Sequence, residues 1–201
     1  MKTRHVVLLG IAIVIGLGAV IGIQALASPY TYQGSLIDPP APAQDFALRD
    51  QFDEPFRLSE QRGEVVLLFF GYTHCPDVCP VTLSEYRQVS DLLGEQADRV
   101  NFVFVTVDPE RDTRSALQDY LDNFNTPIIG LTGERVELEP VWSAFGVFQE
   151  KVDVGSASGY LVDHTARVYA INPQGELQLT FPFGTSSEAI AQDVAHLLRK
   201  N

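Results

Sequence analysis

The feature that most constrains the fold is an unbroken run of apolar residues from Val65 to Phe70. A short run without alternation is typical of a strand buried on both faces, and such strands occur in mostly parallel sheets covered by helices. Phe102 to Val107 has the same character, and apolar residues at helical spacing lie between the two runs. The sequence therefore predicts an α/β domain with right-handed crossovers around one sheet.

Elements in the rest of the chain continue this alternation. We expect the helix after the first strand to begin at Pro80, with Thr82 and Glu85 as a capping box, and the last helix to begin with a second box at Thr185 and Glu188. The other predicted elements are strands at residues 128–131, 165–171 and 176–181 and helices at 117–124 and 134–145. The sheet should thus finish with an antiparallel hairpin and a helix.

The loop from Gly71 to Pro80 contains both cysteines of the chain, Cys75 and Cys79. A strand, a cysteine loop and a helix in this order form the layout of the thioredoxin fold, with the loop at the carboxyl end of a strand, where open α/β sheets place their sites. With three residues between the cysteines, one helical turn would bring both sulfurs to the same side. A helix start favours thiolates, which are soft ligands for Cu(I) or zinc. Two cysteines alone argue against an iron–sulfur cluster.

A metal site needs a third ligand, and the chain has four histidines. His5 precedes the apolar N-terminal segment, His196 lies in the last predicted helix, and His74 adjoins Cys75, where it would point away or support the site from outside. His164 stands at the start of a predicted strand, beside the cysteine loop in a thioredoxin-like sheet. Taken alone, a single histidine is more often structural than a ligand.

The N-terminal segment has the length and composition of a membrane span. Val6 to Ala27 contains no charged side chain and would be about 33 Å long as a helix, enough to cross a bilayer core of about 30 Å. Basic residues precede it, which predicts a cytoplasmic N-terminus and export of the rest. A cleaved signal peptide is the alternative, because Ala25 to Ala27 resembles a cleavage site, although the apolar core of such peptides is shorter, at about 7–15 residues. We expect residues 1–27 to anchor the protein in the bacterial cytoplasmic membrane, with its soluble domain on the outer side.

The remaining chain divides into a linker and one domain. Residues 28–44 contain four prolines without a helical or strand period, which favours an extended tether, and residues 45–201 have the size of one domain. The formal net charge is −12, or −14 once Lys2 and Arg4 are set aside with the anchor. This acidic balance argues against nucleic acid or anionic lipid surfaces as partners.

Three segments together resemble the SCO/SenC family. They are Phe70 to Pro80 with its Cys-Pro-Asp-Val-Cys-Pro, Val107 to Thr113 with Val-Asp-Pro-Glu-Arg-Asp-Thr, and Val162 to Thr165 with Val-Asp-His-Thr. Members of that family are membrane-anchored, thioredoxin-fold copper proteins that help to assemble the binuclear copper-A centre of cytochrome c oxidase. The likeness extends from about Phe46 to the C-terminus, and it implies that Cys75, Cys79 and His164 are copper ligands.

The chemistry of these donors agrees with the resemblance. Two thiolates and one imidazole suit Cu(I) in trigonal geometry and can also hold Cu(II), whereas a structural zinc site normally has a fourth protein ligand. The resemblance implies a metallochaperone whose partner is the copper-binding subunit of cytochrome c oxidase. Other copper carriers are possible further partners. Three-coordinate copper leaves an approach open for a partner's ligand.

Acidic residues near these motifs have more than one interpretation. Asp163 could orient His164 or belong to a strand edge, and Asp77 is expected to stabilise the turn rather than tune the thiolates. The segment Asp108 to Asp112 is expected to form a turn and helix cap, although the family resemblance would allow it to face a partner.

The alternative function is a thiol–disulfide oxidoreductase that reduces the cysteines of the oxidase copper site. An exposed cysteine pair in an oxidising compartment can exchange through a mixed disulfide, so Cys75 and Cys79 would be its redox-active pair. Such an enzyme has no evident need for His164. A structural disulfide would close too small a loop to add much stability, and a peroxidase of the peroxiredoxin type finds no further support in the sequence.

Overall fold

The computed structural model describes residues 30–156 and 159–199, and the compact unit that carries the site begins at Gln33. Among the described residues no helix is both long enough and apolar enough to cross a bilayer. The predicted span from Val6 to Ala27 lies outside this part of the chain.

A mixed eight-stranded sheet forms the centre of the unit, in the order β1-β10-β9-β4-β5-β6-β2-β3. Its middle strands β4, β5 and β6 are parallel, and β9 joins β4 in the antiparallel direction. Every residue of β4 is buried, as the apolar run predicts. The strands are β1 (Ser35–Pro42), β2 (Ala47–Asp50), β3 (Pro55–Arg57), β4 (Val65–Gly71), β5 (Val100–Thr106), β6 (Ile129–Thr132), β9 (Arg167–Ile171) and β10 (Glu176–Pro182).

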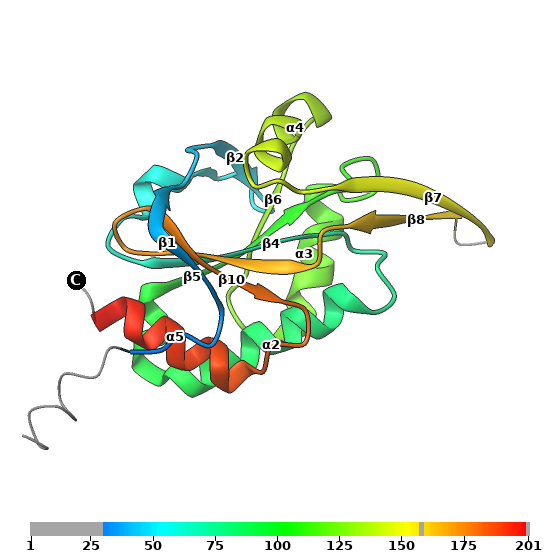
Figure 1. Cartoon of the computed structure of the whole chain (residues 1–201). Coiled ribbons are helices and arrows are strands. Elements are labelled where there is room, and N and C mark those ends of the chain that lie inside the picture. Colours follow the sequence, from blue (N-terminus) through cyan, green and yellow to red (C-terminus); the bar gives the residue numbers. More distant parts are fainter. Residues whose placement is uncertain (1–29, 157–158, 200–201) are drawn as a thin grey trace, which may run out of the picture. The chain divides into compact units, whose positions relative to one another are not determined.

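Helices cover the sheet, as shown in Figure 1. In that view α2 and α5 lie side by side below the sheet and α4 lies above it. The helices are α2 (Val78–Leu93), α3 (Arg114–Leu121), α4 (Arg135–Ala144) and α5 (Ser187–Arg199), with short 3-10 segments η1 (Leu58–Gln61), η2 (Gly94–Arg99) and η3 (Asp122–Phe124). The antiparallel hairpin of β9 and β10, followed by α5, confirms the predicted end of the sheet.

Both predicted capping boxes are wrong in position. Helix α2 begins at Val78, so Pro80 is its third residue and Thr82 is buried inside it. Proline is tolerated throughout the first turn, because the N–H groups there have no intrahelical partner. At α5 the cap is Ser186, whose hydroxyl oxygen accepts a hydrogen bond from the backbone N–H of Ala189 at 3.3 Å. The earlier start of α2 places Cys79 within the helix.

The segment predicted as a tether is partly a strand. Ser35–Pro42 forms β1, which pairs antiparallel with β10 at the edge of the sheet. The backbone N–H groups of Gln33 and Gly34 also donate to the buried carboxylate of Asp193, at 2.8–3.1 Å. An edge strand needs few buried side chains and tolerates proline, so the absence of an apolar period could not reveal it.

A second sheet was not predicted at all. It is a two-stranded antiparallel hairpin of β7 (Gln149–Ser156) and β8 (Gly159–His164). Figure 1 shows it extending past the end of the central sheet. Its strands carry charged residues on an exposed face and few buried ones, which gives a weak strand signal. This hairpin matters because its last residue is His164.

Candidate metal centre

Three elements bring Cys75, Cys79 and His164 together. Cys75 lies in the loop after β4, Cys79 is the second residue of α2, and His164 ends β8. Their ligand atoms all lie within 4.8 Å of one another, and the Cys79 Sγ is 3.6 Å from the His164 Nε2. Among the described residues this is the one group of three or more candidate ligands with such spacing. The three residues singled out from the sequence therefore form a single cluster.

Cys75 is a thiolate in this arrangement. Its pKa is lowered to about 3, chiefly because the Cys79 thiol hydrogen-bonds to its sulfur, with further lowering by His164 and by the backbone N–H groups of Asp77 and Cys79. Burial opposes this shift, since the side chain is half-buried. These N–H groups lie at the N-terminus of α2, on the cap residue Asp77 and the second helical residue Cys79, where helix starts stabilise anions.

Cys79 has the opposite character. It is fully buried, and its pKa is raised by the hydrogen bond it gives to Cys75, by burial and by the negative charge of the Cys75 thiolate. The metal-free pair therefore holds one proton, on Cys79. A cation binding between the two sulfurs would replace this proton, because both ligands must then be thiolates.

The backbone at Gly71 makes room for Cys79. A Cβ atom there would lie 2.8 Å from the Cys79 Sγ and 2.8 Å from a ring carbon of Phe104. Glycine at the end of β4 thus allows the sulfur to approach the sheet directly.

Two aromatic rings and one carbonyl group orient His164. Its ring packs edge-to-face against Phe69 and Tyr72, with centroids 6.1 and 5.8 Å away. Its Nδ1 lies 3.2 Å from the carbonyl oxygen of Thr165, which can only accept a hydrogen bond, so Nδ1 carries the proton. Nε2 is consequently the ring nitrogen that faces the cysteines and that a metal ion would bind.

The turn from Asp108 to Asp112 has a larger role than the sequence suggested. The predicted turn is present, because the N–H groups of Arg111 and Asp112 donate to the Asp108 carbonyl. The cap of α3, however, is Thr113. Asp108 and Asp112 are both fully buried. Asp112 contacts Thr73 in the cysteine loop, and Asp108 contacts Tyr160 in the strand that ends at His164. The sequence could not predict these contacts, because it displays the motif but not the distant residues that bind to it.

The other polar residues named from the sequence lie around the cluster without joining it. Asp163 is exposed, and the hydrogen bond of the His164 Nδ1 goes to Thr165 instead, so its suggested orienting role is wrong. Asp77 precedes α2 and acts through its backbone, whose carbonyl accepts from Val81. His74 is exposed and lies 2.9 Å from the Thr73 hydroxyl. His196 lies in α5, and His5 is outside the described residues.

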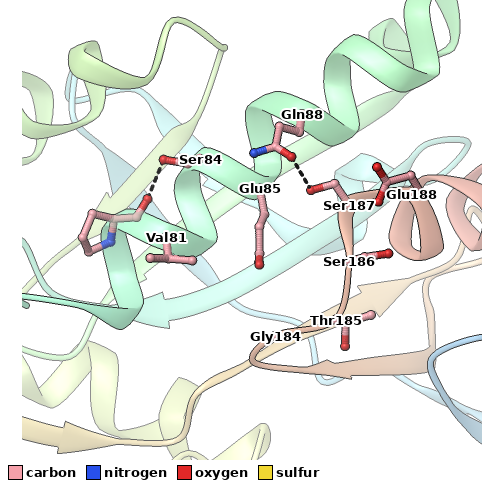
Figure 2. Close-up of a pocket in the computed structure, with 10 residues that line it drawn as sticks. Val81, Ser84, Glu85, Gln88, Gly184, Thr185, Ser186, Ser187 and Glu188 are labelled. Atoms are coloured by element: carbon pink, nitrogen blue, oxygen red, sulfur yellow. Dashed lines mark hydrogen bonds between the residues drawn. The ribbon is translucent and has the colours of Figure 1, made fainter.

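A groove of about 460 Å³ begins directly after Cys79. Figure 2 shows it between the first turns of α2 and the segment leading into α5, where the Ser187 hydroxyl donates to Gln88 across the two helices. Glu85 and Glu188 also line it. None of the three clustered residues lines this groove.

The donor set decides which ions suit the cluster. Two sulfurs and one imidazole nitrogen are soft ligands that favour Cu(I), and the same three donors can hold Cu(II). Zinc at a structural site would normally take a fourth protein ligand. The cluster could therefore hold a copper ion.

Comparison with known proteins gives the family of the chain. A family model described as SCO1/SenC matches residues 35–199. The chain belongs to this family. Among SCO1/SenC relatives, an SCO2-like protein of Rickettsia felis is 34% identical over 149 residues, which cover 74% of this chain and 73% of that protein. The human mitochondrial SCO1 homolog is 34% identical over 156 residues, covering 77% of this chain and 52% of the human protein.

Solved structures of SCO1/SenC proteins share the fold. ScoI of Bradyrhizobium japonicum, solved with copper bound, is 36% identical, with a TM-score of 0.72 over 78% of this chain and 99% of that one. Apo Sco1 of Thermus thermophilus is 35% identical, with a TM-score of 0.75 over 85% of this chain and 99% of that one. The mixed sheet with flanking helices matches these thioredoxin-like structures, as the sequence predicted.

Proposed function

We propose that this protein is a copper chaperone that binds one copper ion through Cys75, Cys79 and His164 and delivers it for assembly of the copper-A centre of cytochrome c oxidase. The observation that carries the proposal is the juxtaposition of two sulfurs and one imidazole nitrogen within 4.8 Å. Membership of the SCO1/SenC family and the copper bound to ScoI of Bradyrhizobium japonicum support it.

Transfer of the ion requires an accessible, incompletely filled coordination sphere. Three protein donors leave room for a further ligand from the recipient, the copper-binding subunit of the oxidase. Cys75 is the more exposed sulfur of the two, so we expect the recipient's ligand to approach from its side. The proposed location is the outer side of the bacterial cytoplasmic membrane, with Val6 to Ala27 as the anchor.

Copper titration of the full chain in detergent, reduced and free of oxygen, tests the proposal. We expect the wild type to bind one copper ion and His164→Ala and the Cys75→Ser/Cys79→Ser double variant to lose it or to bind it far more weakly. His74→Ala is the matched control, because this exposed histidine adjoins Cys75 and lies outside the cluster. Wild-type affinity in all variants would contradict the ligand set.

Thiol–disulfide exchange is the second candidate function, favoured by the half-exposed Cys75 thiolate next to the Cys79 thiol. An attacking thiolate beside a resolving thiol is the arrangement that exchange requires. His164→Ala separates the candidates. If this variant loses copper but still reduces disulfides and still supports oxidase assembly in cells, the oxidoreductase is correct and the chaperone is not.

A further inference from the structure

The position of His164 depends on side-chain contacts of its hairpin. The β7–β8 hairpin is a separate two-stranded sheet, whereas both cysteines follow β4 of the central sheet. A two-stranded hairpin alone is at best marginally stable in water. The chain holds His164 on one side, because β9 of the central sheet begins three residues later at Arg167. Contacts with the body of the domain hold the rest of the hairpin, and several of them come from the turn at residues 108–112, here called the 108–112 turn.

Asp108 and Arg111 hold Tyr160 of β8 at three points. The Tyr160 hydroxyl donates to the Asp108 carboxylate at 2.7 Å, and the Arg111 Nη1 donates to the Tyr160 carbonyl oxygen at 2.9 Å. The guanidinium carbon of Arg111 also lies 3.8 Å from the centroid of the Tyr160 ring. Because the backbone, the ring face and the hydroxyl are all engaged, Tyr160 can shift little along or across the turn.

The charges behind this contact are one buried carboxylate and one partly buried guanidinium. Asp108 is 0% exposed and pairs with Arg111, whose side chain is 18% exposed. A buried ion pair adds little net stability compared with apolar packing, although breaking it is costly. Its presence here is better explained by a need for fixed geometry than by a need for stability.

The contacts continue from the turn to the ligand. The Arg111 guanidinium lies 5.7 Å from the ring centroid of Tyr72, and Tyr72 packs edge-to-face on His164. On the outer side, Lys151 of β7 lies 2.5 Å from the Glu110 carboxylate and 4.6 Å from the Tyr160 ring. The ion pair of Lys151 is exposed and contributes little by itself.

The same turn also holds the cysteine loop. The buried Asp112 carboxylate accepts hydrogen bonds from the hydroxyl of Thr73 at 2.7 Å and from its backbone N–H at 3.2 Å. It also accepts one from the Thr106 hydroxyl at 2.6 Å. Thr73 stands two residues before Cys75. One turn thus contacts the segment that carries the cysteines and the segment that carries the histidine.

We propose that the 108–112 turn positions the metal centre, with Arg111 and Tyr160 fixing His164 at its distance from Cys75 and Cys79. The inference rests on the proposed copper function, since it concerns the same site. Arg111 and Tyr160 are positioning residues: the contacts described here reach the ligands through Tyr72 and the backbone of β8. Weakening the contact between the 108–112 turn and Tyr160 should lower copper affinity by displacing His164, while Cys75 and Cys79 remain in place.

Two conservative variants in the full chain test the proposal. Tyr160→Phe removes only the hydroxyl bonded to Asp108, and Arg111→Lys keeps the charge but removes the flat group that stacks on Tyr160. We expect both to weaken copper binding by about tenfold or more, the usual cost of losing a group that orients a ligand. The Cu(II)–thiolate absorption should shift toward that of His164→Ala. In the metal-free protein, amide hydrogen exchange should quicken in residues 149–156 and 159–164.

Tyr86→Phe is the matched control, because it removes a buried tyrosine hydroxyl that donates to the Leu67 carbonyl at 2.9 Å, inside the core. It should lower stability without changing copper affinity or the copper spectrum. Wild-type affinity, spectrum and hairpin exchange in both test variants would overturn the proposal, as would equal copper losses in Tyr86→Phe. The wild type could also bind no copper while amide hydrogen exchange in the hairpin still quickens in the test variants. In that case the proposed function is wrong, but the conclusion that the 108–112 turn positions the hairpin remains correct.

Discussion

Cys75 and Cys79 are four residues apart, yet their surroundings make them chemically different. Cys75 is half-buried and receives hydrogen bonds from the Cys79 thiol and from backbone N–H groups at the start of α2, those of Asp77 and Cys79, whereas Cys79 is fully buried against the sheet. The spacing in the sequence predicts that both sulfurs face one point. The difference between their pKa values comes first from the hydrogen bond that Cys79 gives to Cys75, and then from the deeper burial of Cys79 against the end of β4.

Alkylation of the reduced, metal-free protein should reveal this difference. Because the pKa of Cys75 is lowered to about 3, it is already a thiolate at pH 5, and its rate with iodoacetamide should change little between pH 5 and pH 8. An unperturbed thiol, with a pKa of about 8.5, reacts roughly tenfold faster for each pH unit over this range. Peptide mapping by mass spectrometry would measure both cysteines separately.

Cys79→Ala tests whether the Cys79 thiol is the cause of the low pKa of Cys75. It removes the thiol donor that contributes most to lowering the pKa of Cys75, so the alkylation profile should move to higher pH. A wild-type Cys75 whose rate climbs steadily up to pH 8 would contradict the assignment of the thiolate.

At the scale of elements, the junction of β4 and α2 determines where the sulfurs lie. The sequence correctly predicted a buried strand, a loop and a helix at this junction. Six apolar residues before the loop and an apolar helical stripe after it leave few alternatives. The sequence placed the start of α2 at Pro80 rather than at Val78, since proline is allowed at several positions of a first turn. The β7–β8 hairpin was missed because its exposed strands are stabilised by distant partners, such as Asp108, that no local pattern displays.

Gly71→Ala tests how tightly this junction is packed. The added methyl group would lie 2.8 Å from both the Cys79 sulfur and the Phe104 ring, so we expect a loss of about 1–3 kcal/mol in the free energy of unfolding, the usual cost of overpacking. Displacement of Cys79 should also weaken copper binding. Urea denaturation and copper titration would measure the two effects.

Gly133→Ala is the comparison for this variant. There the nearest atom is the end of the exposed Glu137 side chain, which can move aside by giving up its hydrogen bond with the Glu134 N–H at the start of α4, so we expect a smaller loss of stability and no loss of copper affinity. Similar losses of stability and copper affinity at both positions would show that the junction is not specially constrained.

At the scale of the whole molecule, β1 makes the segment before Asp45 part of the fold. The sequence identified the boundary of the apolar core but not this strand, because pairing with β10 uses backbone groups and leaves most β1 side chains exposed. The contacts of Gln33 and Gly34 with the buried Asp193 connect it to α5 as well. The domain that folds is therefore longer than the domain predicted from composition.

Truncation should show the contribution of β1. A chain beginning at Asp45 loses the β1–β10 pairing and two backbone donors to the Asp193 carboxylate. We expect it to be less stable than a chain beginning at Ser28 by about 2–4 kcal/mol, since hydrogen bonds to a buried charged group are among the stronger ones. Urea unfolding of the two chains would measure the difference, and equal midpoints and slopes would show that residues 28–44 are a dispensable tether after all.

The separation of the β7–β8 hairpin from the central sheet has a consequence for kinetics. Two of the proposed ligands follow the buried strand β4 of the central sheet, and the third ends a hairpin that forms a sheet of its own. We expect the coordination sphere to open by a local movement of the hairpin, because local opening generally costs less free energy than global unfolding. Ion exchange and unfolding should then proceed on independent timescales, as the proposed copper carrier requires.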